Sequence, residues 1–591
     1  MTWLPAPCFI ALALLQLGIS FLAHDYARYG LLVHEAALKG LSVALFALAG
    51  LAAALPGFRR WLVARLDGLC EVPRRTHVLW VGAAYAGVFL GLGFFHYCTY
   101  RRYLLLNDTA FSVNLAYNFV HFGTLEHTMF GAHALSIHFM FLMAVFSPVL
   151  LVWNDPLALL AVQHALVCSV PFAAYALAFQ RTASSAAGFC ALLLTLCTPY
   201  FHDLVGSNLH ISSLAAFLPW GVFFLASGRR AAAAACLALM LCTYETAAFA
   251  LAGYGVYLLA GERRPRAGLA VVAAAAALFC LELALARSFE AREPLAIGPV
   301  QRFAMFSHLA PAGTPPGRFI GEVLGHPGRL LAHLFSSPYL YFPSFRVLFF
   351  AGFLPLLTPA QLVLWTAILP QVLSGRGEAM SLLDHVPKTY YDFGGHHGAF
   401  LLGPLAFATA LGAAAALRRW PARWEPRGAL LVLALATSGA GLRSTKVWTN
   451  QDFMPRWFDA MPRVLAQVPP RARVWADDNV TPHLANRRWI RLINYSRDVS
   501  YDLGYQKLFK PDYVVLDKAW VDFALSPNRE TLLTYWAQNG FTKAAEDSDV
   551  LLLRAPEPAL RPDEVPEWVR LPEPDPALAR QYGAYLLAEG K

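Results

Sequence analysis

The hydrophobic pattern of this chain consists of long apolar runs separated by short polar stretches. A helix that crosses a membrane needs about 20 apolar residues. By that measure the sequence predicts thirteen membrane-spanning helices, counting two short ones around Glu245. The predicted spans are 8–23, 38–56, 78–98, 157–179, 184–200, 211–227, 231–244, 246–260, 268–287, 343–357, 359–375, 398–416 and 428–444. The first run lacks a basic leader and a small-residue cleavage site, so we expect it to be retained as a span.

Arginine positions predict the orientation of these spans. Arginines cluster in 57–77, at 229–230, in 261–266 and in 418–427. Alternating the thirteen spans places all four clusters on one side, and cytoplasmic loops are enriched in Lys and Arg. The N-terminus is therefore predicted inside and the C-terminal region outside, in a bacterial inner membrane.

A polar stretch, "LNDTAFSVNLAYNFVHFGTLEHTMFGAHALSIHF" (106–139), follows the third predicted span and therefore faces outside. Residues 111–122 place Phe111 and Leu115 on one helical face and Asn114 and Asn118 on another, which predicts an interfacial amphipathic helix. Residues 138–154 are short for a span and contain a proline, and we expect them to lie in or dip into the outer interface. The region 99–156 is thus predicted to be the first large external loop.

The polar character of the chain changes after about residue 444. Residues 472–478, 489–494, 512–517 and 549–555 are predicted strands and 529–540 a predicted amphipathic helix, so 445–556 is expected to form a small α/β domain outside the membrane. Residues 557–591, rich in Pro, Glu and Asp, are predicted to be a flexible tail. The fold class is therefore a polytopic α-helical membrane protein, with spans in 1–98 and 157–444 and a C-terminal extracytoplasmic α/β domain.

Composition narrows the function classes. The chain has 591 residues, of which 57% are hydrophobic and 14% charged, against about 25% charged in soluble domains. Its net charge of +9 comes from the loop arginines, so it does not indicate nucleic-acid binding. The nine cysteines form no CxxC pair, and no Gly-rich phosphate loop or hydrolase motif is present.

Asp108 is the candidate catalytic residue. It follows Arg101 and Arg102, two arginines that stand on the outer side against the positive-inside bias. A carboxylate beside guanidinium groups suits a reaction in which a hydroxyl attacks and a phosphate leaves. The alternative is that both arginines anchor the third span at lipid headgroups or pair with Asp108.

Other polar side chains fall on the same predicted side. They are the candidates for substrate binding together with the two arginines: Asn114, His138, His210, Glu245, His396 and His397. Asp108, His133 and His138 are candidate ligands of a divalent metal ion. The alternative is that external loops simply carry polar residues and that each histidine is satisfied locally.

Several blocks, in order, resemble the bacterial membrane proteins grouped as DUF2079. The blocks are "NDTAFSVNLAYN", "IHFMFLMAVFSP", "NLHISSLAAFL", "TYETAAF", "FGGHHGAFLLGPLAFA", "ARVWADDNVTPHLANRR" and "PDYVVLD". Ser212 and Ser213, Thr246 and Asn114 depart from the family pattern. That family is similar in plan to the GT-C glycosyltransferases, which use polyprenyl-phosphate-linked sugars and carry an acidic residue in the first large external loop.

The resemblance implies a lipid-phosphate sugar donor, with Asp108 as base or metal partner. A transporter or lipid flippase and a non-catalytic envelope assembly protein stay open as alternatives. A transporter predicts paired charges within spans and inverted repeats, and an assembly protein predicts a tail domain that binds a partner. The sugar, the acceptor and the oligomeric state do not follow from the sequence.

Overall fold

The computed structural model describes most of the chain between residues 26 and 556. The described residues are 26–101, 103, 105, 107–129, 132–137, 139–207, 209, 211–290, 309–310, 314, 316–336, 345–373, 398–445, 460–493, 511–518 and 529–556. The predicted first span (8–23) and the predicted tail (557–591) lie outside these residues.

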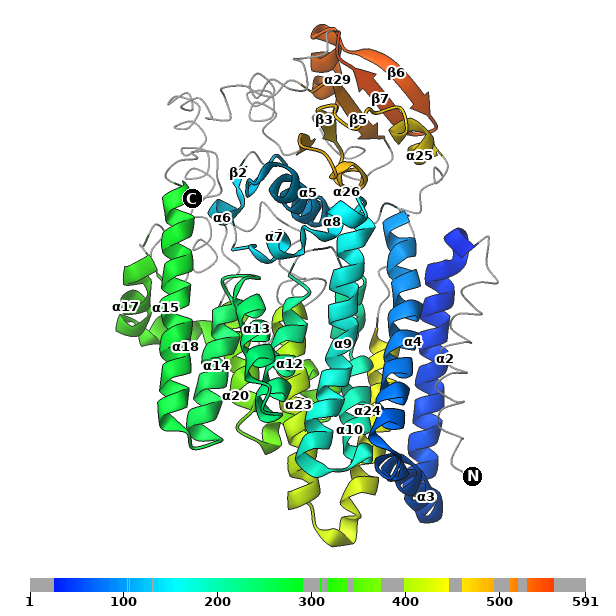
Figure 1. The fold of residues 1–591 in the computed structure, drawn as a ribbon, viewed down its shortest axis with the longest axis vertical. Coiled ribbons are helices and arrows are strands. Elements are labelled where there is room, and N and C mark those ends of the chain that lie inside the picture. Colours follow the sequence, from blue (N-terminus) through cyan, green and yellow to red (C-terminus); the bar gives the residue numbers. More distant parts are fainter. Residues whose placement is uncertain are drawn as a thin grey trace.

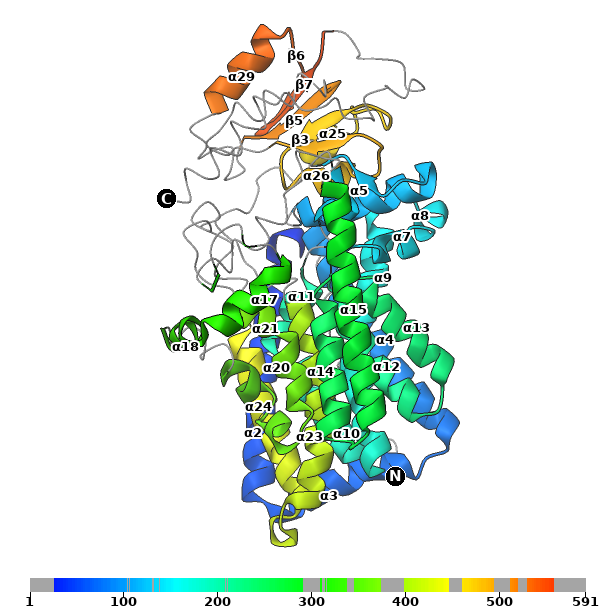
Figure 2. The same cartoon turned by 90° about the vertical axis from the view of Figure 1, so that its left-hand side faces the viewer.

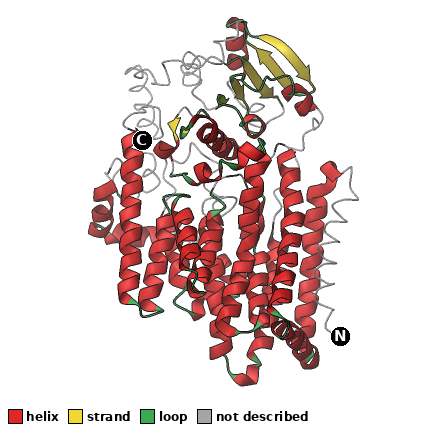
Figure 3. Ribbon diagram, viewed as in Figure 1, coloured by secondary structure: helices red, strands yellow, loops and turns green. Residues whose placement is uncertain are grey.

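The molecule is an elongated helical bundle with a β-sheet at one end (Figures 1 and 3). Its longer helices are α2 (Tyr26–Ala54), α4 (Arg74–Arg101), α9 (Pro156–Thr182), α10 (Ser185–Leu196), α12 (Leu214–Ala226), α13 (Arg230–Leu241), α14 (Ala247–Ala260), α15 (Pro265–Glu290), α23 (Ala399–Arg419) and α24 (Pro426–Ser444). Shorter helices are α3 (Pro56–Asp67), α11 (Pro199–Val205), α17 (Pro316–Gly325), α18 (Pro327–Ser336), α20 (Gln361–Ala367) and α21 (Leu369–Leu373), with 3-10 turns at Gly68–Cys70, Leu354–Leu357 and Ala422–Trp424.

Five described helices are long and apolar enough to cross a membrane. They cover Ala37–Ala54, Arg74–Arg101, Pro156–Thr182, Pro265–Ala286 and Gly398–Arg419. A sixth candidate is the pair α10 and α11, bent by 61° where Thr198 caps α11 and Pro199 begins it. Other predicted spans coincide with shorter apolar helices such as α12, α13 and α14, of 13, 12 and 14 residues. The count of thirteen spans therefore stays a prediction, because these helices are shorter than the length a full crossing needs.

Helix α23 forms the centre of the bundle, since 94% of its apolar window is buried inside the protein. Small residues let its neighbours approach closely. A Cβ atom added at Gly403 would lie 2.5 Å from the carbonyl oxygen of Ala215 in α12. Close backbone contact of this kind replaces the hydrophobic driving force that helices lack inside a lipid bilayer.

Ion pairs join the arginine-bearing loops at one end of the bundle. Arg59 binds Glu425 at 2.8 Å, and Arg427 binds Asp67 at 3.2 Å. Arg181 binds Glu262 at 3.2 Å. We call this the arginine end: residues 56–73, 181–184, 227–229, 261–264 and 418–427. The arginine clusters that the sequence assigns to one side thus gather at one end of the molecule.

At the opposite end lies a five-stranded mixed sheet (Figure 1). Its strands are β3 (Val474–Ala476), β4 (Ile490–Leu492), β5 (Tyr513–Asp517), β6 (Thr542–Asp547) and β7 (Val550–Arg554), accompanied by α25 (Ala460–Leu465), α26 (Thr481–Leu484) and α29 (Arg529–Gln538). The order is β4-β3-β5-β7-β6, with β3 parallel to β4 and β5 and the β5–β7 and β6–β7 pairs antiparallel. Trp475, Trp536 and Leu516 belong to its own hydrophobic core.

The sequence predicted four of these five strands and missed β6. That strand reads Thr-Lys-Ala-Ala-Glu-Asp and is largely exposed, so it shows no apolar alternation. It forms an edge of the sheet, where charged side chains protect the open hydrogen-bonding groups from pairing with another chain.

The outer loop packs between the bundle and the sheet (Figure 2). It contains α5 (Asn107–Phe122), the hairpin β1 (Glu126–His127) and β2 (Ala132–His133), α6 (Ala134–Ile137), α7 (Leu142–Phe146) and α8 (Val149–Val152). We call this loop, the turn at 242–246 and the sheet together the sheet end.

The prediction of an interfacial amphipathic helix at 111–122 was right about the helix and wrong about its surroundings. Phe111 is 4% exposed, but Asn114 and Asn118 on the polar face are also only 0% and 3% exposed. The polar face lies against protein rather than water, because residues 485–487 next to α26 cover it. In contrast, Leu151 and Val152 are exposed, as expected of a segment that lies in the interface.

Candidate functional site

Asp108 lies in the first turn of α5, at the sheet end. Its side chain is partly buried. A carboxylate in this position is favoured by the partial positive charge of a helix N-terminus. The hydroxyl of the next residue, Thr109, accepts a hydrogen bond from the backbone N–H of Leu209 at 3.0 Å. The structure therefore places the turn of Asp108 beside the segment that leads to residue 210.

Arg101 ends α4 and is exposed, within a tight turn in which the N–H of Tyr103 donates to the carbonyl of Tyr100. Tyr103 in that turn has a left-handed backbone conformation with φ of 57°. The ring of His483 lies between Tyr100 and Tyr103, with centroid distances of 4.2 Å and 3.9 Å. Burial, and to a smaller degree the charge of Arg101, lowers the pKa of His483 to about 3. The imidazole is therefore a neutral packing element that fastens the sheet to the end of α4.

The side chain of Asn114 is enclosed by protein and is not open to a ligand. Its amide nitrogen donates to the carbonyl of Arg487 at 2.7 Å, and its amide oxygen accepts from the backbone N–H of Thr128 at 2.9 Å. Asn118 donates to the same oxygen at 3.3 Å. With its side chain fully buried and both amide atoms bonded to protein groups, Asn114 connects α5, the hairpin and the sheet. We therefore do not carry it forward as a substrate-binding residue.

Arg487 and Arg488, which the sequence did not single out, continue this connection. The guanidinium of Arg487 donates to the carbonyls of Leu484 at 2.7 Å and Ala472 at 3.2 Å, and burial lowers its pKa to about 10. Arg488 lies 4.4 Å above the ring of Phe122. Their only sequence signal was an Arg-Arg pair in an otherwise weakly charged block.

Glu126, at the start of the hairpin, lies near Arg488. Burial raises the pKa of Glu126, and the positive charge of Arg488 partly opposes that rise. Burial likewise lowers the pKa of Arg488. The two groups therefore place a half-buried pair of opposite charges at the sheet end.

Glu245 lies in the turn between α13 and α14 and contacts the outer loop. Its carboxylate accepts the backbone N–H of Phe139 at 3.2 Å. Nearby, the N–H of Leu142 donates to the carbonyl of Cys242 at 2.7 Å. These two hydrogen bonds join the segment after residue 138 to the 242–245 turn.

His133 packs against the end of α15. Its ring stacks on Phe289 at a centroid distance of 3.9 Å, and its Nδ1 accepts the N–H of Leu135 at 3.3 Å. Within the described part of the chain, no three His, Cys, Asp or Glu side chains are grouped so that they could hold a metal ion. The predicted metal site at Asp108, His133 and His138 stays untested, since His138 lies outside the described residues.

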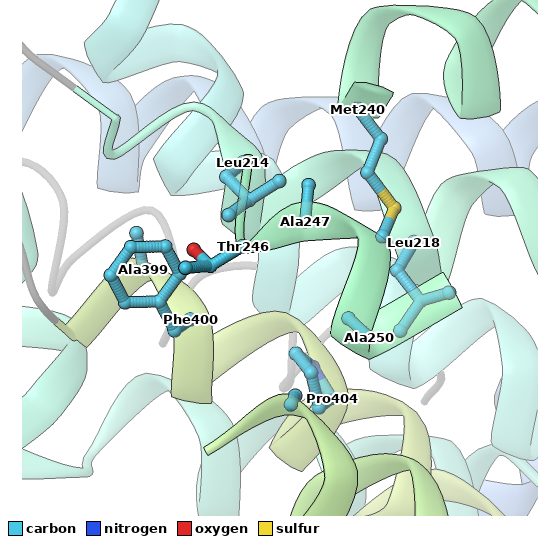
Figure 4. A pocket seen from close by; sticks show the side chains of 10 residues that line it. Leu214, Leu218, Met240, Thr246, Ala247, Ala250, Ala399, Phe400 and Pro404 are labelled. Atoms are coloured by element: carbon cyan, nitrogen blue, oxygen red, sulfur yellow. The ribbon is translucent and has the colours of Figure 1, made fainter. Parts of the chain in front are cut away.

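The remaining predicted residues, Arg102, His210, His396 and His397, also lie outside the described residues. Segments that follow Glu245, residue 210 and the histidine pair line a small, almost wholly apolar pocket in the bundle (Figure 4). Thr246 follows Glu245, Ala399 and Phe400 follow the histidine pair, and Leu214 follows residue 210. The other lining residues are Leu218, Met240, Ala247, Ala250, Ala367 and Pro404.

Glu282 is the polar residue that the sequence interpretation missed. It lies on α15 inside a candidate span, is 2% exposed, and has no hydrogen-bond partner for either carboxylate oxygen among the described residues. A single carboxylate in the apolar run "LFCLELALA" was the available signal, because ionisable residues inside membrane helices are rare and usually functional.

Comparison with known proteins gives one strong match and two weak ones. No curated protein matches the chain. Among solved structures, ArnT from Cupriavidus metallidurans bound to undecaprenyl phosphate is similar at a TM-score of 0.39 and 13% identity, over 81% of this chain and 98% of that one. The same ArnT in the apo state gives 0.35 and 14%, over 76% and 93%. Both TM-scores are below 0.5, so these likenesses support no conclusion about the site.

The family match covers residues 111–552, about three quarters of the chain, and its family is described as a predicted membrane protein (DUF2079). The matched region includes the outer loop from the second turn of α5, the bundle from α9 onward and the five-stranded sheet. Together with helices apolar enough to cross a membrane, this match shows that the chain is a membrane protein and belongs to the DUF2079 family.

Proposed function

We propose that this protein transfers a sugar from a polyprenyl-phosphate donor to a hydroxyl acceptor at the outer face of a bacterial inner membrane. The acceptor oxygen attacks the anomeric carbon of the sugar, and the bond from that carbon to the phosphate oxygen breaks. Polyprenyl phosphate leaves with the electron pair. The acceptor proton passes to Asp108, which acts as general base.

The other roles follow from charge and position. Arg101, with Arg102, holds the leaving phosphate, since guanidinium groups bind phosphate oxygens in a bidentate way. His138, His210, Glu245, His396 and His397 line the cleft.

One observation carries the proposal, namely the position of Asp108. Its carboxylate is partly buried in the first turn of α5, between the bundle and the sheet and at the end opposite the arginine loops. A base in this place can meet a donor that arrives from the bilayer and an acceptor that arrives from the sheet side. Partial burial also strengthens its electrostatic interaction with nearby cations.

The direct test is donor turnover by purified full-length protein in lipid nanodiscs. A panel of polyprenyl-phosphate sugars is supplied with membranes as the acceptor source, and release of polyprenyl phosphate is measured. We expect one donor to be consumed by the wild type and by Asp547→Asn, an exposed substitution at the far edge of the sheet. Turnover by Asp108→Asn at the wild-type rate would remove the base assignment, and no turnover of any donor would remove the transferase proposal.

Ion-coupled transport is a second candidate, because Glu282 places a buried carboxylate within a candidate span. Such residues often belong to proton or ion pathways. Uptake of labelled lipid or solute into proteoliposomes that depends on an ion gradient would favour this function over transfer.

A further inference from the structure

Glu282 points from a lipid-facing helix into the protein. On α15, the residues Ala275, Glu282 and Ala286 are 1%, 2% and 7% exposed. They are seven and four positions apart and therefore share one helical face. Leu269 and Leu281 on the other side are 61% and 54% exposed. The helix thus turns a carboxylate toward the bundle while its apolar side chains face outward.

The carboxylate of Glu282 has no compensating group among the described residues. Neither oxygen has a hydrogen-bond partner. The ring of Phe279 on the same helix contacts Phe249 of α14 at a centroid distance of 5.3 Å, so the two antiparallel helices bring the turn that carries Glu245 level with Glu282. A buried charge without a partner costs several kcal/mol, and a second negative charge nearby raises that cost. Among the described residues, no cation pairs with Glu282.

The second carboxylate is held in position by the outer loop. Glu245 accepts the N–H of Phe139 through one oxygen, and the Leu142 to Cys242 hydrogen bond fixes the same turn. The adjacent hydroxyl of Thr246 is buried and likewise has no partner in the described part of the chain. The 242–246 turn therefore presents a carboxylate and a buried hydroxyl, and Glu282 on α15 adds the second carboxylate.

We propose that Glu245 and Glu282 bind a divalent cation of the hard, oxygen-preferring class, Mg²⁺ or Mn²⁺. Such ions are held by one or two carboxylates and keep several water ligands, which fits a site with two protein carboxylates. The cation neutralises both acids and joins α15 to the 242–246 turn and, through Phe139, to the outer loop. This site uses neither Asp108 nor His133 as a ligand, and it does not depend on sugar transfer.

Mn²⁺ binding to the full-length protein in nanodiscs, followed by electron paramagnetic resonance without any donor lipid, tests the site. We expect the wild type to bind Mn²⁺, and Glu282→Gln and Glu245→Gln to weaken binding at least about tenfold. Glu262→Gln is the matched control, since Glu262 pairs with Arg181 at the arginine end. Absence of binding by the wild type up to about 1 mM Mn²⁺, or equal binding by the wild type and Glu282→Gln, would overturn the proposal.

Thermal unfolding keeps the test decisive if a variant folds poorly. In excess chelator, Glu282→Gln should unfold at about the same temperature as the wild type, because a buried carboxyl without a cation takes up a proton and then matches the amide in size and charge. Mn²⁺ should raise the unfolding temperature of the wild type and leave that of Glu282→Gln unchanged. A Glu282→Gln protein that is less stable than the wild type in chelator would show that Glu282 has a protein partner, and the cation site would be abandoned. Because no donor is present, these outcomes are independent of the transfer assay.

Discussion

The two ends of this molecule use polar residues in opposite ways. At the arginine end, charges of both signs pair across loops and stay partly exposed: the side chains of Arg181 and Glu262 are 36% and 22% accessible, and those of Arg427 and Asp67 57% and 21%. At the sheet end and on α15, several polar side chains are buried. Asn114 and Glu282 are 0% and 2% exposed, the first with both amide atoms bonded to protein and the second without a partner among the described residues.

This difference predicts where substitutions matter. An exposed ion pair gains little free energy, because water screens it and two long side chains must be ordered. A buried polar group without a hydrogen-bond partner costs free energy. We therefore expect each one at the sheet end either to bond to another part of the protein or to bind a ligand. We therefore expect substitutions at the sheet end to change activity and stability more than substitutions at the arginine end.

The largest effect is expected at Asp108. Replacing it by asparagine keeps the size of the side chain and removes the proton acceptor, so the transfer rate should fall by at least about 100-fold. Donor turnover in nanodiscs measures the change, with thermal unfolding as a check that the fold is retained. An Asp108→Asn protein that is unchanged in rate would place the chemistry elsewhere at the sheet end.

The next effect is expected at Asn114. Alanine there leaves the carbonyl of Arg487 and the N–H of Thr128 buried without their partner, which should cost about 3 kcal/mol of stability. The measurement is thermal unfolding together with protease cleavage of the sheet from the bundle. Asn539→Ala is the control, because that exposed amide bonds only to the carbonyl of Tyr535. Equal effects of the two alanines would contradict the stabilising role of the buried Asn114 amide.

The pH dependence of stability sharpens the comparison further. Burial lowers the pKa of His483 to about 3. In the unfolded chain this histidine takes up a proton near its ordinary pKa of about 6.5, whereas the folded protein excludes that proton until about pH 3. The contribution of His483 to stability is therefore complete above pH 6.5 and is lost as the pH falls toward 3.

At pH 5 this loss amounts to about 2 kcal/mol. His483→Phe keeps a ring between Tyr100 and Tyr103 and has no proton to bind, so its stability should fall less between pH 7 and pH 5. Unfolding temperatures of both proteins across this range provide the comparison. Parallel curves would show that His483 is accessible to protons in the folded state.

The smallest effect is expected at the arginine end. Glu262→Gln removes the charge that faces Arg181 at 3.2 Å and should cost about 0.5 kcal/mol. High salt should abolish the difference in unfolding temperature from the wild type. A cost comparable to that of Asn114→Ala would mean that the two ends do not differ in the way described.

Several features of the fold followed from local sequence pattern. Arginine clusters between apolar runs predicted which loops share one end, and the ion pairs from Arg59 to Glu425 and from Arg427 to Asp67 join them. Apolar alternation predicted the strands at 474–476, 490–492, 513–517 and 550–554. The order and direction of these strands did not follow, because neighbours in a sheet need not be neighbours in sequence.

The site was predicted less completely. The sequence identified Asp108 and Glu245 as polar residues outside the apolar runs, and it passed over Glu282 within one. It also assigned Asn114 to substrate, although residues 485–487, more than 370 positions away, occupy its amide. No short-range pattern contains a contact of that kind.

The sequence by itself determined that this is a membrane protein, because the length and spacing of apolar runs decide which segments can cross a bilayer. Its ordered motif blocks determined the DUF2079 family. Only the tertiary structure decided which buried polar groups are hydrogen-bonded within the protein and which remain to bind a ligand. Asn114 and Glu282 are equally buried, and the difference between them lies in whether distant segments of the chain bring them hydrogen-bond partners. Whether a buried group has a hydrogen-bond partner depends on three-dimensional packing, and this property distinguishes Glu282 on α15 from Asn114 at the sheet end.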